Sequence, residues 1–110
     1  ASTGAAGAAV THTLAAVAGK RHRIQFLHII GYATAARTGG ATPTIPTITG
    51  LDNANISFSF PTAQAIGTLA ELKMEGMAGL EGLVNTNVVV TCPATASVIW
   101  TVIVGYITGA

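Results

Sequence analysis

Charged side chains are scarce in this 110-residue chain. Five basic and four acidic residues make up 8% of it, whereas an average soluble domain has roughly 25% charged residues. Half of the residues are hydrophobic, so the chain cannot cover its own surface with charge. The formal net charge of +1 gives no electrostatic reason to expect binding to nucleic acid or to anionic lipid. We therefore expect other protein to cover much of the surface.

The sequence also has little that would cross-link, target or anchor the chain. The single cysteine, Cys92, cannot form a disulfide within the chain, and its apolar neighbours predict a buried small hydrophobe. The first residues lack a basic start followed by an apolar run, so we expect no secretory signal. The longest apolar stretch, 98–107, is about half of the roughly 20 residues that cross a bilayer. The sequence therefore predicts no membrane span.

Alternating apolar and polar residues predict short β-strands along most of the chain. The first nine residues are only Ala, Gly, Ser and Thr, which predicts a flexible arm, Ala1–Ala9, before one domain, Val10–Ala110. Strands are expected from Val10, from Arg23, over 56–60, over 88–91 and from Val98. In the strand that follows Arg23, regular alternation places one set of side chains on a common face: Ile24, Phe26, His28, Ile30 and Tyr32.

Two segments give weaker signals. Ile45 and Ile48 predict a short strand that Pro46 confines to a sheet edge. Within 63–83, alternation predicts a strand whose outer face carries Glu71, Lys73 and Glu75, although residues 68–77 are also of types that favour helix. The glycines of this segment favour the strand.

Six to eight short strands in a chain of this length are typical of a β-sandwich. We predict an all-β fold, a single β-sandwich or jelly-roll-like domain with a flexible N-terminal arm. The last strand is apolar on both faces, since Ile99, Ile103 and Ile107 alternate with the residues expected to face the core. In an antiparallel sandwich one face of a sheet normally meets water. The second face is therefore expected to be covered by another subunit or a partner.

Patterns for catalysis and metal binding are weak. Glu71 and Glu75 would share a face and could be read as a general acid–base pair, but a solvated face is the simpler interpretation. His12, His22 and His28 lack the spacing of a familiar zinc site, and we expect His12 and His28 to be core or interface residues. The sequence predicts no enzymatic activity, no cofactor and no metal site.

Two further patterns have both a functional and a structural interpretation. Lys20, Arg21 and Arg23, with His22, form a basic run that could grip phosphate, but a solvated turn is favoured. Trp100 and Tyr106 could stack on a base or a sugar, but their even spacing within one strand favours core packing.

Three stretches of the chain resemble a group of small virion proteins of tailed phages. They are residues 15–29, with an Ala-Gly-Lys-Arg-His turn, residues 58–61, and residues 83–106, with Asn-Thr-Asn-Val-Val-Val-Thr before a strand that ends at Gly-Tyr. The resemblance implies a capsid decoration (cement) protein, a small β-sandwich or jelly roll, often trimeric, on the outer surface of the major capsid protein lattice. It implies a place on the virion and no catalytic residues. Residues 63–82 depart from the pattern and are a possible lattice or trimer contact.

On this interpretation, residues are assigned to two kinds of contact. The arm and the loop after the second strand are expected to touch the major capsid protein through Ala1, Ser2, Thr3, Val10, Arg37, Thr42, Pro43 and Ile45. Contacts between subunits of a homotrimer are expected at Ile99, Ile103, Ile107, Met74 and Met77. The alternative is a receptor- or carbohydrate-binding module of a tail fibre or spike. That function would need exposed aromatic residues, which the expected loops almost lack.

Overall fold

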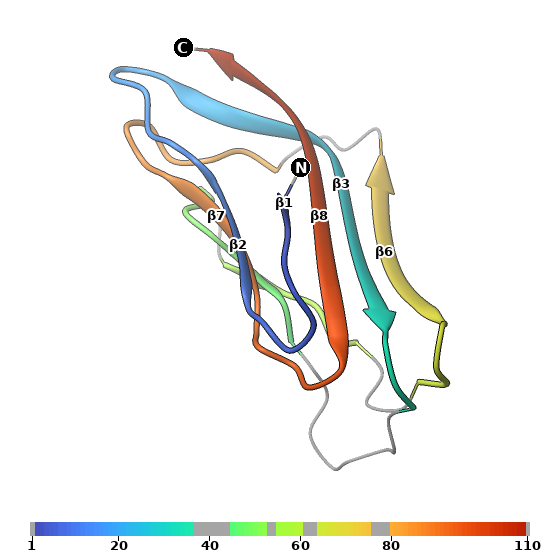
Figure 1. Cartoon of the computed structure of the whole chain (residues 1–110). Helices are drawn as coiled ribbons and strands as arrows, with labels where there is room; N and C mark the ends of the chain where they lie inside the picture. The colour runs from blue at the N-terminus through green and yellow to red at the C-terminus, as the bar shows by residue number, and fades with distance from the viewer. Residues whose placement is uncertain (1, 37–44, 53–54, 61–63, 76–79, 110) are drawn as a thin grey trace.

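Antiparallel β-strands form two four-stranded sheets that pack face to face (Figure 1). The computed structural model describes residues 2–36, 45–52, 55–60, 64–75 and 80–109. Sheet A has the order β1-β8-β3-β6, and sheet B has the order β2-β7-β4-β5. The strands are β1 (Ser2–Thr3), β2 (Val10–Leu14), β3 (Arg21–Ala33), β4 (Thr47–Thr49), β5 (Ile56–Ser57), β6 (Leu69–Glu75), β7 (Val88–Cys92) and β8 (Val98–Gly109). The predicted all-β fold is confirmed. Within the described ranges no helix is long and apolar enough to cross a membrane.

The core lies between the inner faces of the two sheets. The long strands β3 and β8 pair along most of their length and contribute fully buried side chains such as Leu27 and Ile29. Trp100 on β8 is also buried, and its Nε1–H donates a 3.0 Å hydrogen bond to the Pro93 carbonyl. Its ring meets the edge of Phe60 at a centroid distance of 5.3 Å. Trp100 is therefore a core residue, as its spacing predicted, and it is not available for stacking on a ligand.

A β-bulge in β3 changes which side chains face the core. The pairing of β3 with β8 shifts register between Ile24 and Phe26, on either side of Gln25. One extra residue moves every later side chain to the opposite face from the one a regular strand would give it. Leu27 therefore shares the core face with Ile24, and Phe26 points outward. The prediction that the later even-numbered residues share the face of Ile24 is wrong for this reason.

The ambiguous segment after residue 68 contains a strand. β6 pairs with β3 from Leu69 to Glu75. Ala70, Leu72 and Met74 pack against the core, whereas Glu71 and Lys73 are exposed on the other face. The strand interpretation is confirmed, and the helical alternative is wrong.

The short strand β4 is not at a sheet edge. It lies between β7 and β5. Pro46 does not prevent this interior position, because it precedes the strand and its missing N–H is not needed in the ladder. The Pro46 carbonyl accepts a 2.9 Å hydrogen bond from the Phe58 N–H. Ile48 is buried within β4, while Ile45 lies outside the strand. The expected edge position is therefore wrong.

The described part of the predicted arm lies against sheet A. Ser2 and Thr3 pair with β8, and Ser2 Oγ is 2.6 Å from His12 Nδ1 in hydrogen-bond contact. The N–H of Gly7 donates a 3.0 Å hydrogen bond to the Val98 carbonyl. These contacts join the described part of the arm to the sandwich. The flexibility of the arm stays a prediction.

Candidate functional site

Apolar side chains gather on the face of sheet A that points away from sheet B. They come from three neighbouring strands, and we call them the outer face: Phe26, Ile30 and Tyr32 on β3, Leu69 on β6, and Ile99, Ile103 and Ile107 on β8. Leu69 is 54% exposed, Ile107 51% and Tyr32 40%. A solvated sheet face is normally polar. The outer face therefore has the composition of a contact surface rather than of a surface that faces water.

Strand pairing sets the outer-face side chains side by side. Tyr32 lies opposite Ile99 on one side and opposite Leu69 on the other, which makes an apolar row across three strands. Side chains that are directly opposite in an antiparallel ladder are about 5 Å apart at Cβ. The structure thus brings the three isoleucines predicted for subunit contact, Ile99, Ile103 and Ile107, onto one continuous surface.

His28 is a polar residue within the outer face. Its Nε2–H donates a 2.8 Å hydrogen bond to Glu71 Oε2, and its ring meets that of Phe26 at a centroid distance of 6.3 Å. It lies opposite Ile103 on β8 and Lys73 on β6. The prediction of a histidine with one hydrogen-bond partner therefore fits His28. The charges on β6 border the apolar side chains along one margin of the outer face.

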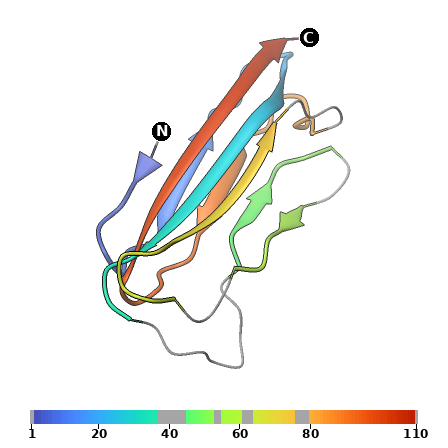
Figure 2. The same cartoon turned by 90° about the vertical axis from the view of Figure 1, so that its right-hand side faces the viewer.

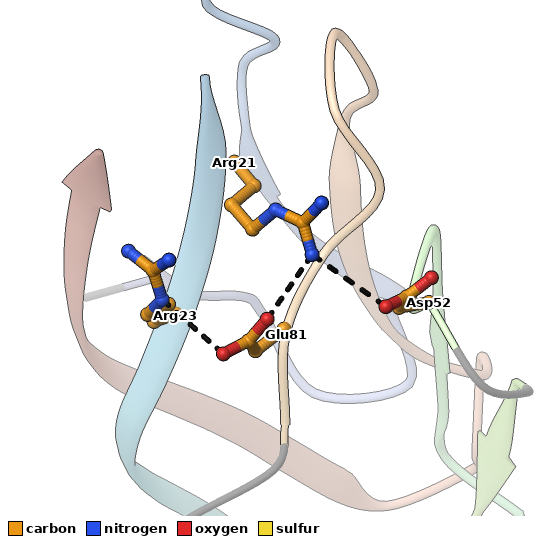
Figure 3. Close-up of polar contacts among 4 residues, drawn as sticks. All are labelled: Arg21, Arg23, Asp52 and Glu81. Carbon is orange, nitrogen blue, oxygen red and sulfur yellow. Dashed lines mark hydrogen bonds and ion pairs between the residues drawn. The ribbon is translucent and has the colours of Figure 1, made fainter. Parts of the chain in front are cut away.

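A cluster of charged residues lies at one end of the sandwich (Figure 3). Arg21 Nη1 is 3.1 Å from Glu81 Oε2 and 3.5 Å from Asp52 Oδ2, and Arg23 Nε is 3.2 Å from Glu81 Oε1. Hydrogen bonds from Arg23 and then Arg21 lower the pKa of the Glu81 carboxyl. We call these four residues the charge cluster. Both guanidinium groups bind carboxylates within the same chain.

The charge cluster is held in place because residues 80–83 pair with both sheets. On the side of sheet A, the Ile24 N–H donates a 2.9 Å hydrogen bond to the Leu80 carbonyl. On the side of sheet B, the Asp52 N–H donates a 2.8 Å hydrogen bond to the Glu81 carbonyl. Arg23 forms a β-bridge with Glu81 on the same segment. The cluster thus supports the junction between the sheets, which is a structural role.

His22 is a buried polar residue on β3, so the solvated turn expected for the basic run is wrong at this position. It is 3% exposed, and its Nε2–H donates a 2.7 Å hydrogen bond to the Ala15 carbonyl. Its Nδ1 is 2.8 Å from Thr108 Oγ1, and its ring meets the edge of Tyr106 at a centroid distance of 5.4 Å. The sequence alternation could have predicted this burial, because His22 lies two residues before Ile24 in the same strand and therefore shares its core face. Its contacts are all internal, which fits a role in fixing the end of β8.

A groove opens on the side of the sandwich where β6 and β5 lie. Figure 2, which shows the molecule from the β6 side, has β4 and β5 on that same side. The groove has a volume of about 400 Å³. Its lining comes from residues after the start of β5 and from β6: Ser57, Phe58, Ser59, Phe60, Ala70, Glu71 and Leu72. The lining is mostly apolar.

The residues predicted to touch the capsid shell lie in different surroundings. Ser2 and Thr3 are on the edge strand β1, and Ile45 is 40% exposed. Val10 is only 5% exposed and is part of the core, so it has almost no surface to offer. Of the subunit-contact residues, Met74 packs against the core. The other predicted contact residues lie outside the described residues: Ala1, Arg37, Thr42, Pro43 and Met77.

Burial shifts the pKa values of two side chains among the described residues. Burial raises the pKa of the Cys92 thiol to about 12, so the thiol stays protonated near neutral pH. Partial burial lowers the pKa of His12, whose ring contacts Ser2. Within the described ranges, no group of three or more His, Cys, Asp and Glu residues is placed to hold a metal ion.

Comparisons with protein families, with curated proteins and with solved structures give no match for this chain. Its function is therefore argued from the outer face, the groove and the charge cluster.

Proposed function

We propose that this chain is a structural virion protein, a capsid decoration (cement) protein that binds the outer surface of a major capsid protein lattice. The observation that supports this proposal is the apolar outer face of sheet A, with Ile107 and Leu69 each more than half exposed. A chain with 8% charged residues and such a face is poorly suited to remain alone in water. It is suited to work by being covered by other protein.

The mechanism is burial of apolar surface. Each square ångström removed from water contributes roughly 25 cal/mol, and a standard interface buries about 1,600 Å². Lost translational and rotational freedom offsets much of this gain. Many copies on one symmetric lattice restore it, because each bound subunit holds its neighbours at high effective concentration. The shell is stabilised without any bond chemistry.

The proposal assigns the outer face to contacts between subunits of a homotrimer. Ile99, Ile103 and Ile107 contribute to it from β8. A jelly-roll-like topology is part of the same proposal. Met74 is left out of the outer face because it packs on the other side of sheet A. If a trimer covers the isoleucines, the sheet edges and the ends of each sandwich stay available for contacts with the capsid.

Contacts with the shell are assigned to the end of the sandwich opposite the charge cluster. The Gly7 N–H donates to the Val98 carbonyl, and the Thr34 N–H donates a 2.8 Å hydrogen bond to the neighbouring Ser97 carbonyl. Gly7 and Thr34 therefore lie near the start of β8, at the same end of the sandwich. Ser2 and Thr3 pair further along β8, with Val102 and Thr101, on the edge strand β1. The proposal places the shell contacts of the expected loop at this end and those of Ser2 and Thr3 along the adjoining β1 edge.

Deletion of residues 1–9 tests the assignment of the arm. The deletion removes the pairing of β1 with β8, the hydrogen bonds from the Gly4 and Gly7 N–H groups to β8 carbonyls and the contact of Ser2 with His12. It removes no large side chain, so we expect the fold to survive. We expect co-sedimentation with undecorated capsids to fall at least about tenfold, since each tenfold loss corresponds to about 1.4 kcal/mol of contact energy. Circular dichroism of the deleted chain serves as the control for folding. Unchanged occupancy on capsids would contradict a role for the arm.

The exposed aromatic residues do not favour the alternative of a carbohydrate-binding module. Tyr32 and Tyr106 are 40% and 46% exposed. Tyr32 pairs with Ile99 and Tyr106 pairs with Ile24, so they lie at opposite ends of sheet A and form no common platform. Specific binding of the isolated protein to a glycan array would reverse this preference.

A further inference from the structure

The strand β6 is an edge of sheet A among the described residues. It pairs with β3 on one side, and Figure 1 shows it at the margin of the sheet. The Ala33 N–H donates to the Thr68 carbonyl, so the opposed pair Ala33 and Thr68 is a hydrogen-bonded pair. Hydrogen-bonded pairs alternate along an antiparallel ladder. The backbone groups of Leu69, Glu71 and Lys73 therefore point away from β3, toward the open edge.

The charges on β6 make this edge complementary to a second copy of itself. Two copies related by a twofold axis would pair their β6 strands antiparallel. An axis through Leu72 places Glu71 of each copy opposite Lys73 of the other, on the outward side of the sheet. An axis through Glu71 or through Lys73 would instead oppose two like charges. Opposite charges that face each other across a ladder stabilise it, and like charges destabilise it. An axis through Met74 would also oppose Lys73 to Glu75, but it would pair only the last residues of the strand. The axis at Leu72 pairs all seven residues of β6, Leu69 to Glu75. The length and the charges of β6 together therefore favour the register centred on Leu72.

The inner side of β6 fits the same register. With the axis at Leu72, Met74 of the second copy lies opposite Ala70, which lines the groove of about 400 Å³. Ala70 is small, and methionine is a long, flexible side chain that fills irregular apolar space. Leu72 of each copy would meet at the axis, also at the groove. Pairing therefore brings apolar side chains to the side of the sandwich where the two sheets are open.

We propose that two copies of this chain associate edge to edge through β6, in antiparallel register centred on Leu72. The pairing joins two copies of sheet A into one continuous sheet with the order β1-β8-β3-β6-β6-β3-β8-β1. It uses the strand edge and leaves the outer face available. It goes beyond the proposed function, because it needs neither a capsid nor the trimer, and it would connect one trimer to the next.

Cysteine cross-linking tests the register directly. Glu71→Cys and Lys73→Cys variants are prepared separately and then mixed under mild oxidation. In the proposed register residues 71 and 73 of different copies are directly opposite, with Cα atoms about 5.5 Å apart, which a disulfide can span. Each variant alone would need a diagonal bridge of about 7–8 Å, which is beyond the usual span. The native Cys92 is buried and does not compete.

We expect the mixture to give a cross-linked dimer at least about fivefold more abundantly than either variant alone, as a strong geometric preference requires. The same preference is expected when both variants also carry Ile103→Thr and Ile107→Thr, because the outer face is not used. Equal cross-linking in the mixture and in the single variants would overturn the register. A preference that disappears with the threonine substitutions would show that the outer face, not the edge, brings the residues together.

Amide hydrogen exchange gives an independent readout of the backbone pairing. In the paired state the N–H groups of Leu69, Glu71 and Lys73 become protected as the protein concentration rises. Lys73→Pro removes one of these edge N–H groups but leaves the ladder to β3 intact, and Lys73→Ala is the matched control that keeps the N–H. We expect concentration-dependent protection in the unaltered protein and in Lys73→Ala, and its loss at Leu69 and Glu71 in Lys73→Pro. Amides that exchange equally fast at every concentration would overturn the proposal, whatever the outcome of capsid binding.

Discussion

Glu81 is the residue on which the junction between the sheets depends most. It accepts from both Arg21 and Arg23, and the backbone on either side of it pairs with sheet A and with sheet B. These arginines lower the pKa of its carboxyl in the folded protein below the ordinary value of 4.5. A carboxyl with a lowered folded pKa adds stability above its unfolded pKa and loses that stability as pH falls through the folded pKa.

We predict that Glu81→Gln lowers the thermal midpoint at pH 7 and that this difference shrinks as the pH falls below 4.5. The reason is that the unfolded carboxyl takes up its proton before the native one, so the stabilisation by the ionised carboxylate is lost as the pH falls through the lowered folded pKa. The amide of the variant does not titrate. Thermal unfolding of both proteins by circular dichroism, over a pH series, measures the difference. A difference that stays constant from pH 7 to pH 3 would contradict the role of the ionised carboxylate.

Gly50 is a second residue whose identity the fold requires. Its φ is +85°, and a Cβ built there would collide with the Asn87 carbonyl oxygen. Gly7 has a φ of +77°, but a Cβ there meets no atom within 4 Å. Gly7→Ala therefore measures the backbone cost alone, and Gly50→Ala adds the collision. We predict losses in unfolding free energy of about 1 kcal/mol for Gly7→Ala and about 3 kcal/mol or more for Gly50→Ala. Urea denaturation compares them, and equal losses would contradict the close approach of Gly50, after β4, to Asn87, before β7.

At the scale of elements, the sequence could predict that β3 is a strand but not that a bulge reverses the faces of its later residues. Alternation located the long strands, because apolar residues at every second position report burial on one face. It did not find β1, which lies in the expected arm, and it predicted a strand over 56–60 where β5 covers only Ile56–Ser57. It could not reveal the bulge, because residues on both sides of Gln25 are apolar. Phe26 and Leu27 are both hydrophobic, so the sequence alone does not show which of them faces the core. The register shift becomes visible only when β8 is laid against β3.

We predict that Leu27→Ala lowers the unfolding free energy by about 3 kcal/mol, because Leu27 is fully buried and its loss leaves a cavity. Phe26→Ala is its matched neighbour on the outer face, and we expect it to cost within about 1 kcal/mol when measured on dilute protein. Urea denaturation gives both values. The opposite ranking would mean that β3 runs through without the bulge.

The outcome for β6 and β4 follows from the same physics. The charges of β6 alternate with apolar residues at period two, so the strand could be predicted although its residue types also favour helix. The position of β4 within sheet B could not, because it depends on the partner strand β5, which has only two residues. The open edge of β6 likewise depends on strand order, which alternation along one strand does not contain.

At the scale of the whole molecule, the sequence predicted the all-β fold and the surplus of apolar surface. Ile99, Ile103 and Ile107 were assigned to one face from alternation alone, and they lie together there. The charge cluster was not foreseen, because Asp52 and Glu81 are far from Arg21 in sequence and meet it only through the sandwich. The groove was missed for the same reason, since β5 and β6 meet only in the packed fold. Binding to a capsid and the trimer remain proposals that rest on the outer face.

The native mass of the protein by light scattering tests the role of the outer face most directly. We predict a mass of three 11.0 kDa chains or a multiple of three for the unaltered protein. A variant with Ile103→Thr and Ile107→Thr keeps β-branched side chains on β8, and we predict that its mass falls to one or two chains. Leu83→Thr removes an exposed apolar side chain away from the outer face and should leave the mass unchanged. An unaltered protein that is monomeric at high concentration would contradict the proposal that the outer face is covered by other copies.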